Sequence, residues 1–222
     1  MAIADFLAIL EKGPSERGGV FNPWRDFDDR DAAPRRESPR VRRENMRAYL
    51  ESRERSARVL LLGEAPSHRG CRFTGIAFCS EVELVHKRDL VARTPLPLTS
   101  PNAHAKPMRE RSAAVIWDEL ERGGCAREVV LWNAFPWHPH GLEANTTNRK
   151  PRLPEVQQGR DAFEALMGCF THRLCVLAVG KVAEDALARW GGPECAGYIR
   201  HPAQGGEAKF RAGFREQAAK LL

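Results

Sequence analysis

Four short apolar runs, separated by stretches of helical pattern, constrain the fold of this chain more than any other feature. The runs span 58–63, 128–132, 174–179 and 196–200, and most end in turns with Gly or polar side chains. Helical patterns cover 107–122 and 154–169, a further helix ends near Trp190, and a last one covers about 206–222. Strands that alternate with helices favour right-handed crossovers and a sheet covered on both faces. We therefore predict a three-layer α/β domain with a central, mainly parallel four-stranded sheet.

The N-terminal part of the chain is expected to be a helix followed by an irregular arm. Residues 3–12 have the pattern of a short helix, residues 13–40 are rich in Gly, Pro, Arg and Asp, and a helical pattern covers 40–55. A chain of this length suits one sizeable domain. We predict a single domain over 1–222, with 1–40 as its N-terminal helix and arm.

Composition and cysteine usage narrow the class of protein. Lys and Arg number 35 against 29 Asp and Glu, a difference of 35 − 29 = +6, which fits a polyanionic partner but does not establish one. The six cysteines form no CxxC pair and have no zinc or iron–sulfur spacing, which favours buried free thiols. The first residues lack the pattern of a signal peptide, and no window has the length and apolarity of a transmembrane span. We predict a reduced, cytoplasmic protein without membrane association.

Polar side chains follow the apolar runs directly, at the expected carboxyl edge of the sheet. The first run leads into Glu64-Ala65-Pro66-Ser67-His68, the second leads to Asn133, and Gly180 ends the third. The fourth leads into His201-Pro202-Ala203-Gln204-Gly205. Open α/β sheets present their sites at this edge, so we expect these segments to form one site.

Six ordered segments resemble motifs of the uracil-DNA glycosylase superfamily, and most closely those of its family-four-type bacterial enzymes. The segments are Gly63-Glu64-Ala65-Pro66, the stretch 70–75 that contains Phe73, Asn133, Asn148-Arg149-Lys150-Pro151, Gly180, and His201-Pro202. They extend across 58–206, and six matches in order are far more specific than any single one. The resemblance implies the fold of that superfamily and an enzyme that flips uracil out of DNA and hydrolyses its N-glycosidic bond in base-excision repair.

The resemblance also implies roles for individual residues. His201 would stabilise the departing uracil anion at O2, and Asn133 would pair with uracil O4 and N3–H. Phe73 would stack on the extruded base. Further substrate contacts would come from Gly63, Ala65, Pro66, Ser67 and His68, and DNA contacts from Arg149, Lys150, Pro202, Ala203, Gln204 and Gly205.

The sequence leaves open which residue activates the attacking water. The best-studied branch of the superfamily has Asp where this chain has Ala65, and in an extended segment the neighbouring Glu64 points to the opposite face. Glu64 is either a catalytic residue that polarises water or a structural carboxylate. The family Ser after His-Pro is replaced by Ala203, which removes one phosphate contact.

Metal binding is not expected. Family-four enzymes hold an iron–sulfur cluster on four cysteines, two of them before the first motif, whereas no cysteine precedes Cys71 here. His138 and His140 lack a third and a fourth ligand at useful spacing, which favours loop histidines near the DNA groove. We therefore predict an enzyme with no metal and no cofactor.

The loop after His201 sets the expected form of the DNA substrate. Gln204 is its only sizeable side chain, so it should be a poor wedge for filling the gap left by a flipped base. We predict a monomer that prefers uracil in single-stranded or weakly paired DNA.

Two rival functions remain open, together with one question about the basic side chains. One rival is a glycosylase for another deaminated base such as hypoxanthine. The other is a low-turnover member that binds uracil-containing or abasic DNA, suggested by Ala65 and Ala203. The arginines at 40, 42, 43 and 47 fit phosphate contacts and a solvated helix face equally well.

Overall fold

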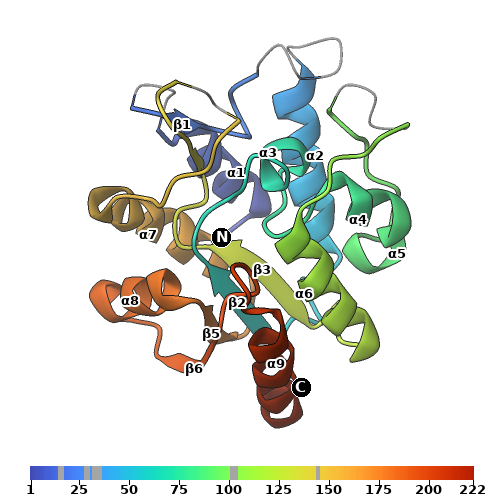
Figure 1. Cartoon of the computed structure of the whole chain (residues 1–222), viewed down its shortest axis with the longest axis vertical. Helices are drawn as coiled ribbons and strands as arrows, with labels where there is room; N and C mark the ends of the chain where they lie inside the picture. Colours follow the sequence, from blue (N-terminus) through green and yellow to red (C-terminus); the bar gives the residue numbers. More distant parts are fainter. Residues whose placement is uncertain (15–17, 28–30, 32–36, 101–104, 144–145) are drawn as a thin grey trace.

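A four-stranded parallel sheet forms the centre of the computed structural model (Figure 1). Its strands are β2 (Val59–Gly63), β3 (Val129–Asn133), β5 (Cys175–Val179) and β6 (Cys195–Ile199), in the order β3-β2-β5-β6. All neighbouring strands pair in parallel, which confirms the predicted sheet. The structure describes residues 1–14, 18–27, 31, 37–100, 105–143 and 146–222, so parts of the expected arm lie outside the described residues.

The burial of the strands follows from their sequences. β2 and β3 are buried at every position, as expected for apolar strands that have a layer of helices on each face. β6 lies at an edge of the sheet and is buried only at its last residue. The register of β2 and β3 sets Gly63 opposite Asn133, so the first two predicted motifs meet at the end of the sheet.

Helices cover both faces of the sheet. The longer ones are α1 (Ile3–Lys12), α2 (Ser38–Glu51), α6 (Arg111–Arg122), α7 (Leu153–Met167), α8 (Lys181–Trp190) and α9 (Glu207–Leu221). The chain passes from β2 to β3 through α6, and then moves in the opposite direction across the sheet through α7 and α8. Right-handed crossovers in opposite directions place their helices on opposite faces. In agreement, α6 packs with α9, whereas α7 packs with α8 and α1 (Figure 1).

The direction of the chain across the sheet reverses between β2 and β5. The segment that leaves β2 leads to β3 on one side, and the segment that leaves β5 leads to β6 on the other. Segments that diverge in this way leave a crevice at the carboxyl ends of the two strands, where open α/β sheets bind their ligands. The topology alone therefore locates the candidate site.

Several short elements were not predicted. The two-residue strands β1 (Val20–Phe21) and β4 (His138–Pro139) pair antiparallel. His138 and His140 are buried, so the expectation of loop histidines near a DNA groove is wrong. The stretch between β2 and α6 contains α3 (Cys71–Thr74), α4 (Glu81–His86) and α5 (Arg88–Val91), and Ser80 begins α4 with a capping box.

Basic side chains of α2 serve the fold. Arg42 is fully buried, and its Nη1 lies 3.0 Å from Oδ1 of Asp31. Arg43 pairs with Glu11 at 3.1 Å, and Arg40 pairs with Glu44 at 2.6 Å. Arg42 and Arg43 therefore fit neither of the two roles expected from the sequence, a phosphate contact or a solvated helix face, because both guanidinium groups are held by carboxylates of the protein. No helix among the described residues has the length and apolarity needed to cross a bilayer.

Candidate functional site

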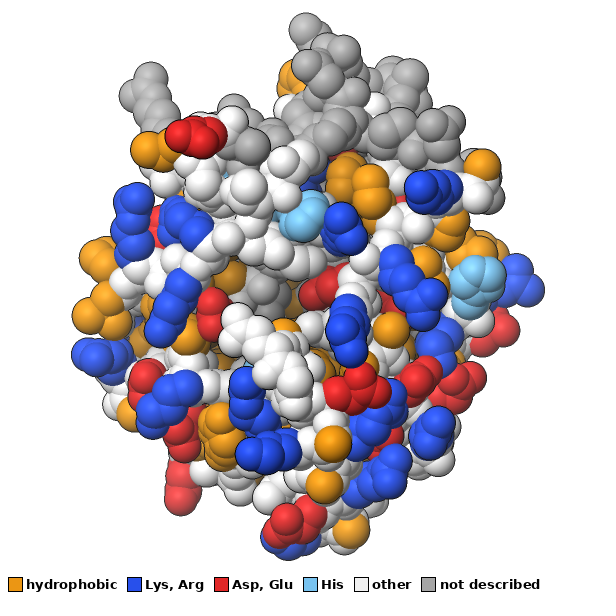
Figure 2. Space-filling model, viewed as in Figure 1, with side chains coloured by type: hydrophobic (Ala, Val, Ile, Leu, Met, Phe, Trp, Pro, Cys, Tyr) orange, Lys and Arg blue, Asp and Glu red, His pale blue; other side chains and the backbone are white. Residues whose placement is uncertain are grey.

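A cleft of about 580 Å³ opens at the carboxyl edge of the sheet. Its walls come from segments 64–67 after β2, 179–182 after β5 and 148–150 before α7, and from Arg200, His201, Ala203 and Gln204 after β6. Lys and Arg side chains lie around a hollow near the middle of this face, with acidic side chains among them (Figure 2). The structure therefore brings the segments that follow β2, β5 and β6 to one cleft, whereas Gly63 and Asn133, which pair at the ends of β2 and β3, are not among its lining residues.

His201 is held as a neutral hydrogen-bond donor. Its Nδ1 accepts the backbone N–H of Ala203 at 3.1 Å, which leaves the ring proton on Nε2. Burial, assisted by Arg200, lowers the pKa of His201 to about 4, so the ring is uncharged at neutral pH. A Cβ at Gly180 would lie 3.1 Å from the Cβ of His201, and the absence of that atom allows the close packing. A fixed N–H donor of this kind suits stabilisation of a developing anion.

Asn133 combines burial with an unused hydrogen-bonding atom. It is 2% exposed, and among the described residues its Oδ1 has no hydrogen-bond partner. A buried acceptor left unpaired costs about 1–3 kcal/mol, so its presence calls for a functional explanation. A Cβ at Gly63 would lie 2.9 Å from this oxygen and 2.0 Å from the Phe78 ring. Glycine at this position therefore lets Asn133 and Phe78 approach each other.

The aromatic ring next to these residues belongs to Phe78. Phe78 lines the cleft, and its ring centroid lies 5.9 Å from that of His201. Its backbone has a φ of +49°, and its carbonyl accepts the indole N–H of Trp117 at 2.8 Å. The stretch after β2 contains two Phe residues, Phe73 and Phe78, and the predicted stacking role was given to Phe73.

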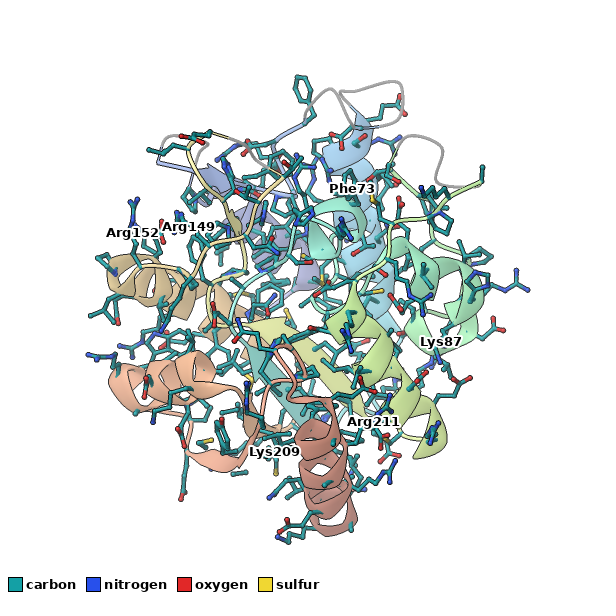
Figure 3. All side chains as sticks on the ribbon, in the orientation of Figure 1. Phe73, Lys87, Arg149, Arg152, Lys209 and Arg211 are labelled. Atoms are coloured by element: carbon teal, nitrogen blue, oxygen red, sulfur yellow. The ribbon has the colours of Figure 1, made fainter. Side chains whose placement is uncertain are left out.

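Phe73 does not occupy the position that its predicted role requires. It lies on α3, is 1% exposed and does not line the cleft (Figure 3). The Arg72 guanidinium lies 5.1 Å from the centre of its ring. We correct the predicted assignment and propose Phe78 as the stacking residue.

Glu64 faces the cleft and is half-buried. Desolvation raises the pKa of this carboxyl, and the nearby Lys150 acts in the opposite direction. Its backbone carbonyl accepts the N–H of Phe135 at 3.0 Å, which ties the turn after β2 to the turn after β3. Ala65, Pro66 and Ser67 also line this wall of the cleft.

The segment before α7 contains one arginine that serves the fold and one lysine at the surface. Arg149 pairs with Glu155 at 2.6 Å and donates to the carbonyls of Gly19 and His140 at 3.1 Å each. These bonds occupy the guanidinium, so we correct its predicted role as a DNA ligand and propose Lys150 as the phosphate contact. Lys150 is exposed at the cleft and, in the part of the chain that the structure describes, forms no ion pair.

The remaining predicted residues lie at the rim. His68 donates its backbone N–H to Asn148 Oδ1 at 2.8 Å and lines an adjoining groove rather than the cleft itself. In the loop after β6, Pro202 is buried, whereas Gln204 and Gly205 are exposed with φ values of +52° and +73°. The exposed tip of this loop is therefore small.

Glu110 also lies at the site, although no motif in the sequence predicts it. It lies immediately before α6 and lines both the cleft and the adjoining groove. Desolvation raises the pKa of its carboxyl to about 7. A glutamate before a helix is a common surface residue, so its local sequence gave no signal of this position.

The cysteines do not fit an iron–sulfur cluster, and the other side chains that the structure describes do not fit another metal centre. Cys71, Cys79, Cys125 and Cys169 are buried free thiols, as expected. Cys175 at the start of β5 is exposed and Cys195 on the edge strand β6 is half-buried, so for these two the expectation of buried thiols is wrong. Within the described ranges, no three His, Cys, Asp or Glu side chains converge on a position that would hold a metal ion.

Comparison with known proteins agrees with the geometry of the site. The family model of the uracil DNA glycosylase superfamily matches residues 51–217, well over half of the chain. By class, the protein is a DNA glycosylase. It belongs to the uracil DNA glycosylase superfamily.

The fold also has a counterpart among solved structures. The structure is similar to the crystal structure of wild-type SMUG2 from Pedobacter heparinus, with a TM-score of 0.62 and 14% sequence identity. The match covers 99% of this chain and 97% of the SMUG2 chain. At that identity the likeness concerns the fold alone. No curated protein sequence matches the chain.

Proposed function

We propose that the protein hydrolyses the N-glycosidic bond of uracil in DNA and leaves an abasic site for base-excision repair. The unpaired Oδ1 of the buried Asn133 amide supports this choice of base most directly. Uracil offers N3–H to an acceptor and O4 to a donor, and a single amide supplies both partners. Cytosine presents the opposite pattern and would leave the Asn133 amide mismatched.

The chemistry assigns complementary tasks to the other side chains. Cleavage leaves negative charge on the departing base and positive character on the sugar. The Nε2–H of neutral His201 would donate to uracil O2 as this charge develops. Phe78 would stack on the flipped base, and Lys150 would contact a phosphate. This scheme requires no metal and no organic cofactor.

Strand preference provides the first test. We expect faster excision of uracil from a single strand than from a U:A duplex, because Gln204 is the only large side chain at the exposed tip of the loop. Matched oligonucleotides that contain uracil, treated with the protein and then with alkali, would report the rates as strand cleavage. A higher rate on the U:A duplex would contradict the preference.

The same oligonucleotides, with hypoxanthine in place of uracil, separate the rival functions. Cleavage of only the hypoxanthine strands would support a glycosylase for that base and contradict the proposed substrate. Tight retention of uracil-containing or abasic DNA in a gel shift, without strand cleavage, would support a binding protein with little turnover.

The identity of the stacking residue gives a second expected result. We expect Phe78→Leu to weaken binding of single-stranded uracil DNA by about fivefold to 150-fold, since stacking is worth about 1–3 kcal/mol per base. Phe73→Leu is the matched control: it should lower the melting temperature but leave the affinity of the folded protein nearly unchanged. Fluorescence anisotropy with labelled oligonucleotides would measure both affinities, and equal losses would contradict the assignment.

A further inference from the structure

We propose that Glu110 is the catalytic base that takes the proton from the attacking water, a role that rests on the proposed hydrolysis of the uracil–sugar bond. Glu110 lines the cleft from the side of α6, and the same residue lines the adjoining groove. It therefore has access both to a water molecule in the cleft and to solvent outside it.

The position of the Glu110 carboxylate depends on a glycine. A Cβ at Gly70 would lie 1.7 Å from Oε2 of Glu110 and 3.3 Å from Oγ of Ser67. The missing side chain at Gly70 thus lets the carboxylate reach the turn after β2. There the Ser67 hydroxyl forms a hydrogen bond with it.

The common structural uses of such a carboxylate do not account for Glu110. A residue directly before a helix often caps the first backbone N–H groups with its side chain, but Glu110 makes no capping bond. The neighbouring buried Glu81 differs, because its carboxylate accepts backbone N–H groups from Thr99, Ser100 and Met108. Among the described residues, the Ser67 hydroxyl is the hydrogen-bond partner of Glu110 and no cation pairs with it.

The other polar groups of the cleft are less suited to accept a proton. In His201, Nδ1 already accepts the Ala203 N–H and Nε2 bears the proton. Ala65 has no functional group. Glu64 has Lys150 nearby, which favours its ionised form and makes it the weaker base.

The electrostatic surroundings match this role. The pKa of Glu110 is raised to about 7: desolvation is the main cause, the Ser67 hydrogen bond acts in the opposite direction, and Glu83 of α4 adds a smaller upward effect. The thiols of Cys71 and Cys79 also face Glu110, but burial raises the pKa of each, so both are uncharged. Glu64 and Lys150 line the same cleft. A base whose pKa lies near the working pH is the most effective one for proton transfer.

The proposed step is balanced. The water oxygen forms a bond to the sugar C1′ while the C1′–N1 bond breaks, and that electron pair leaves with uracil. One proton of the water passes to the Glu110 carboxylate and from there to solvent through the adjoining groove. The uracil anion takes a proton from solvent, so the products are neutral uracil and an abasic sugar.

Single-turnover rates of uracil excision between about pH 5 and pH 9 would test the role. In the parent protein the rate should rise with pH to a plateau, with a midpoint near 7, as Glu110 becomes ionised. Glu110→Gln should remove this rise and lower the plateau about 100-fold. Ser67→Ala should move the midpoint to higher pH, because the hydroxyl stabilises the ionised form. Ser112→Ala, on the same cleft, is the matched control and should leave the midpoint unchanged.

The outcomes separate this role from the proposed function. If the parent protein excises uracil and Glu110→Gln keeps the pH dependence, the role is overturned while the function stands. Loss of the pH dependence in Glu64→Gln instead would assign the base to Glu64. A parent protein that excises no uracil would overturn the proposed function. In that case the infrared band of the protonated Glu110 carboxyl, identified by difference from Glu110→Gln, should still disappear as the pH rises through about 7. A Glu110 carboxyl without such a transition would overturn the titration as well.

Discussion

Replacing His201 with alanine should lower the rate of uracil excision by about 10²–10³-fold, the loss typical of a single donor to a developing anion. The imidazole is uncharged at neutral pH because its pKa lies near 4, so the substitution removes a hydrogen bond and leaves the net charge unaltered. The loss should therefore appear in the single-turnover rate and only weakly in the affinity for DNA. Quenched-flow assays with single-stranded uracil oligonucleotides would measure it.

A matched histidine variant controls for general effects of the substitution. His86 lies at the end of α4, exposed and outside the cleft, and His86→Ala should excise uracil at the parent rate. The neutral His201 ring also predicts that the parent protein keeps this donor throughout the pH range above about 5. A His201→Ala protein as active as the parent would disprove the assignment.

Asn133→Asp should reduce uracil excision by about 10²–10³-fold. The change replaces the amide donor for uracil O4 with a second carboxylate oxygen, in a position that is only 2% exposed. Removing one partner of a buried hydrogen bond and adding charge there costs on the order of 2–5 kcal/mol. Rates measured under single-turnover conditions, normalised to the folded fraction, would give the size of the effect.

Asn45 offers a control with the same chemical change. It is also buried, but its amide donates to the carbonyls of Thr74 and Pro97 and so supports the fold. Asn45→Asp should lower the melting temperature while the folded fraction retains the parent rate. If both variants lost activity only in proportion to their stability, the proposed contact between Asn133 and the base would be wrong.

The sheet and the general position of the site followed from the sequence because local patterns determine them. Continuous apolar runs defined the strands, and the helices between them fixed the parallel order. Polar residues at the strand ends then had to meet at one edge, which is where Gly63, Asn133 and His201 are found. These inferences needed no knowledge of contacts between distant residues.

Other features depended on such contacts and could not be read locally. The stretch after β2 contains both Phe73 and Phe78, and the turn through Gly75, with a φ of +77°, decides which ring reaches the cleft. The sequence predicted a DNA contact for Arg149, but its guanidinium pairs with Glu155, a contact that the local sequence does not reveal. The surroundings of Glu110 are formed by Ser67 and Gly70, which are separated from it in the sequence by α3, α4 and α5.

The N-terminal arm links the integrity of the site to a part of the chain that precedes the family match at residue 51. Trp24 stacks on Trp132 at 6.1 Å, and Phe6 of α1 lies 5.4 Å from the same indole. Trp132 immediately precedes Asn133 on β3, so its packing supports the strand that presents the amide. The smallest functional unit therefore extends beyond the segment that carries the motifs. No described residue of 1–40 lines the cleft, so this part of the chain acts on the site through the packing of β3 alone.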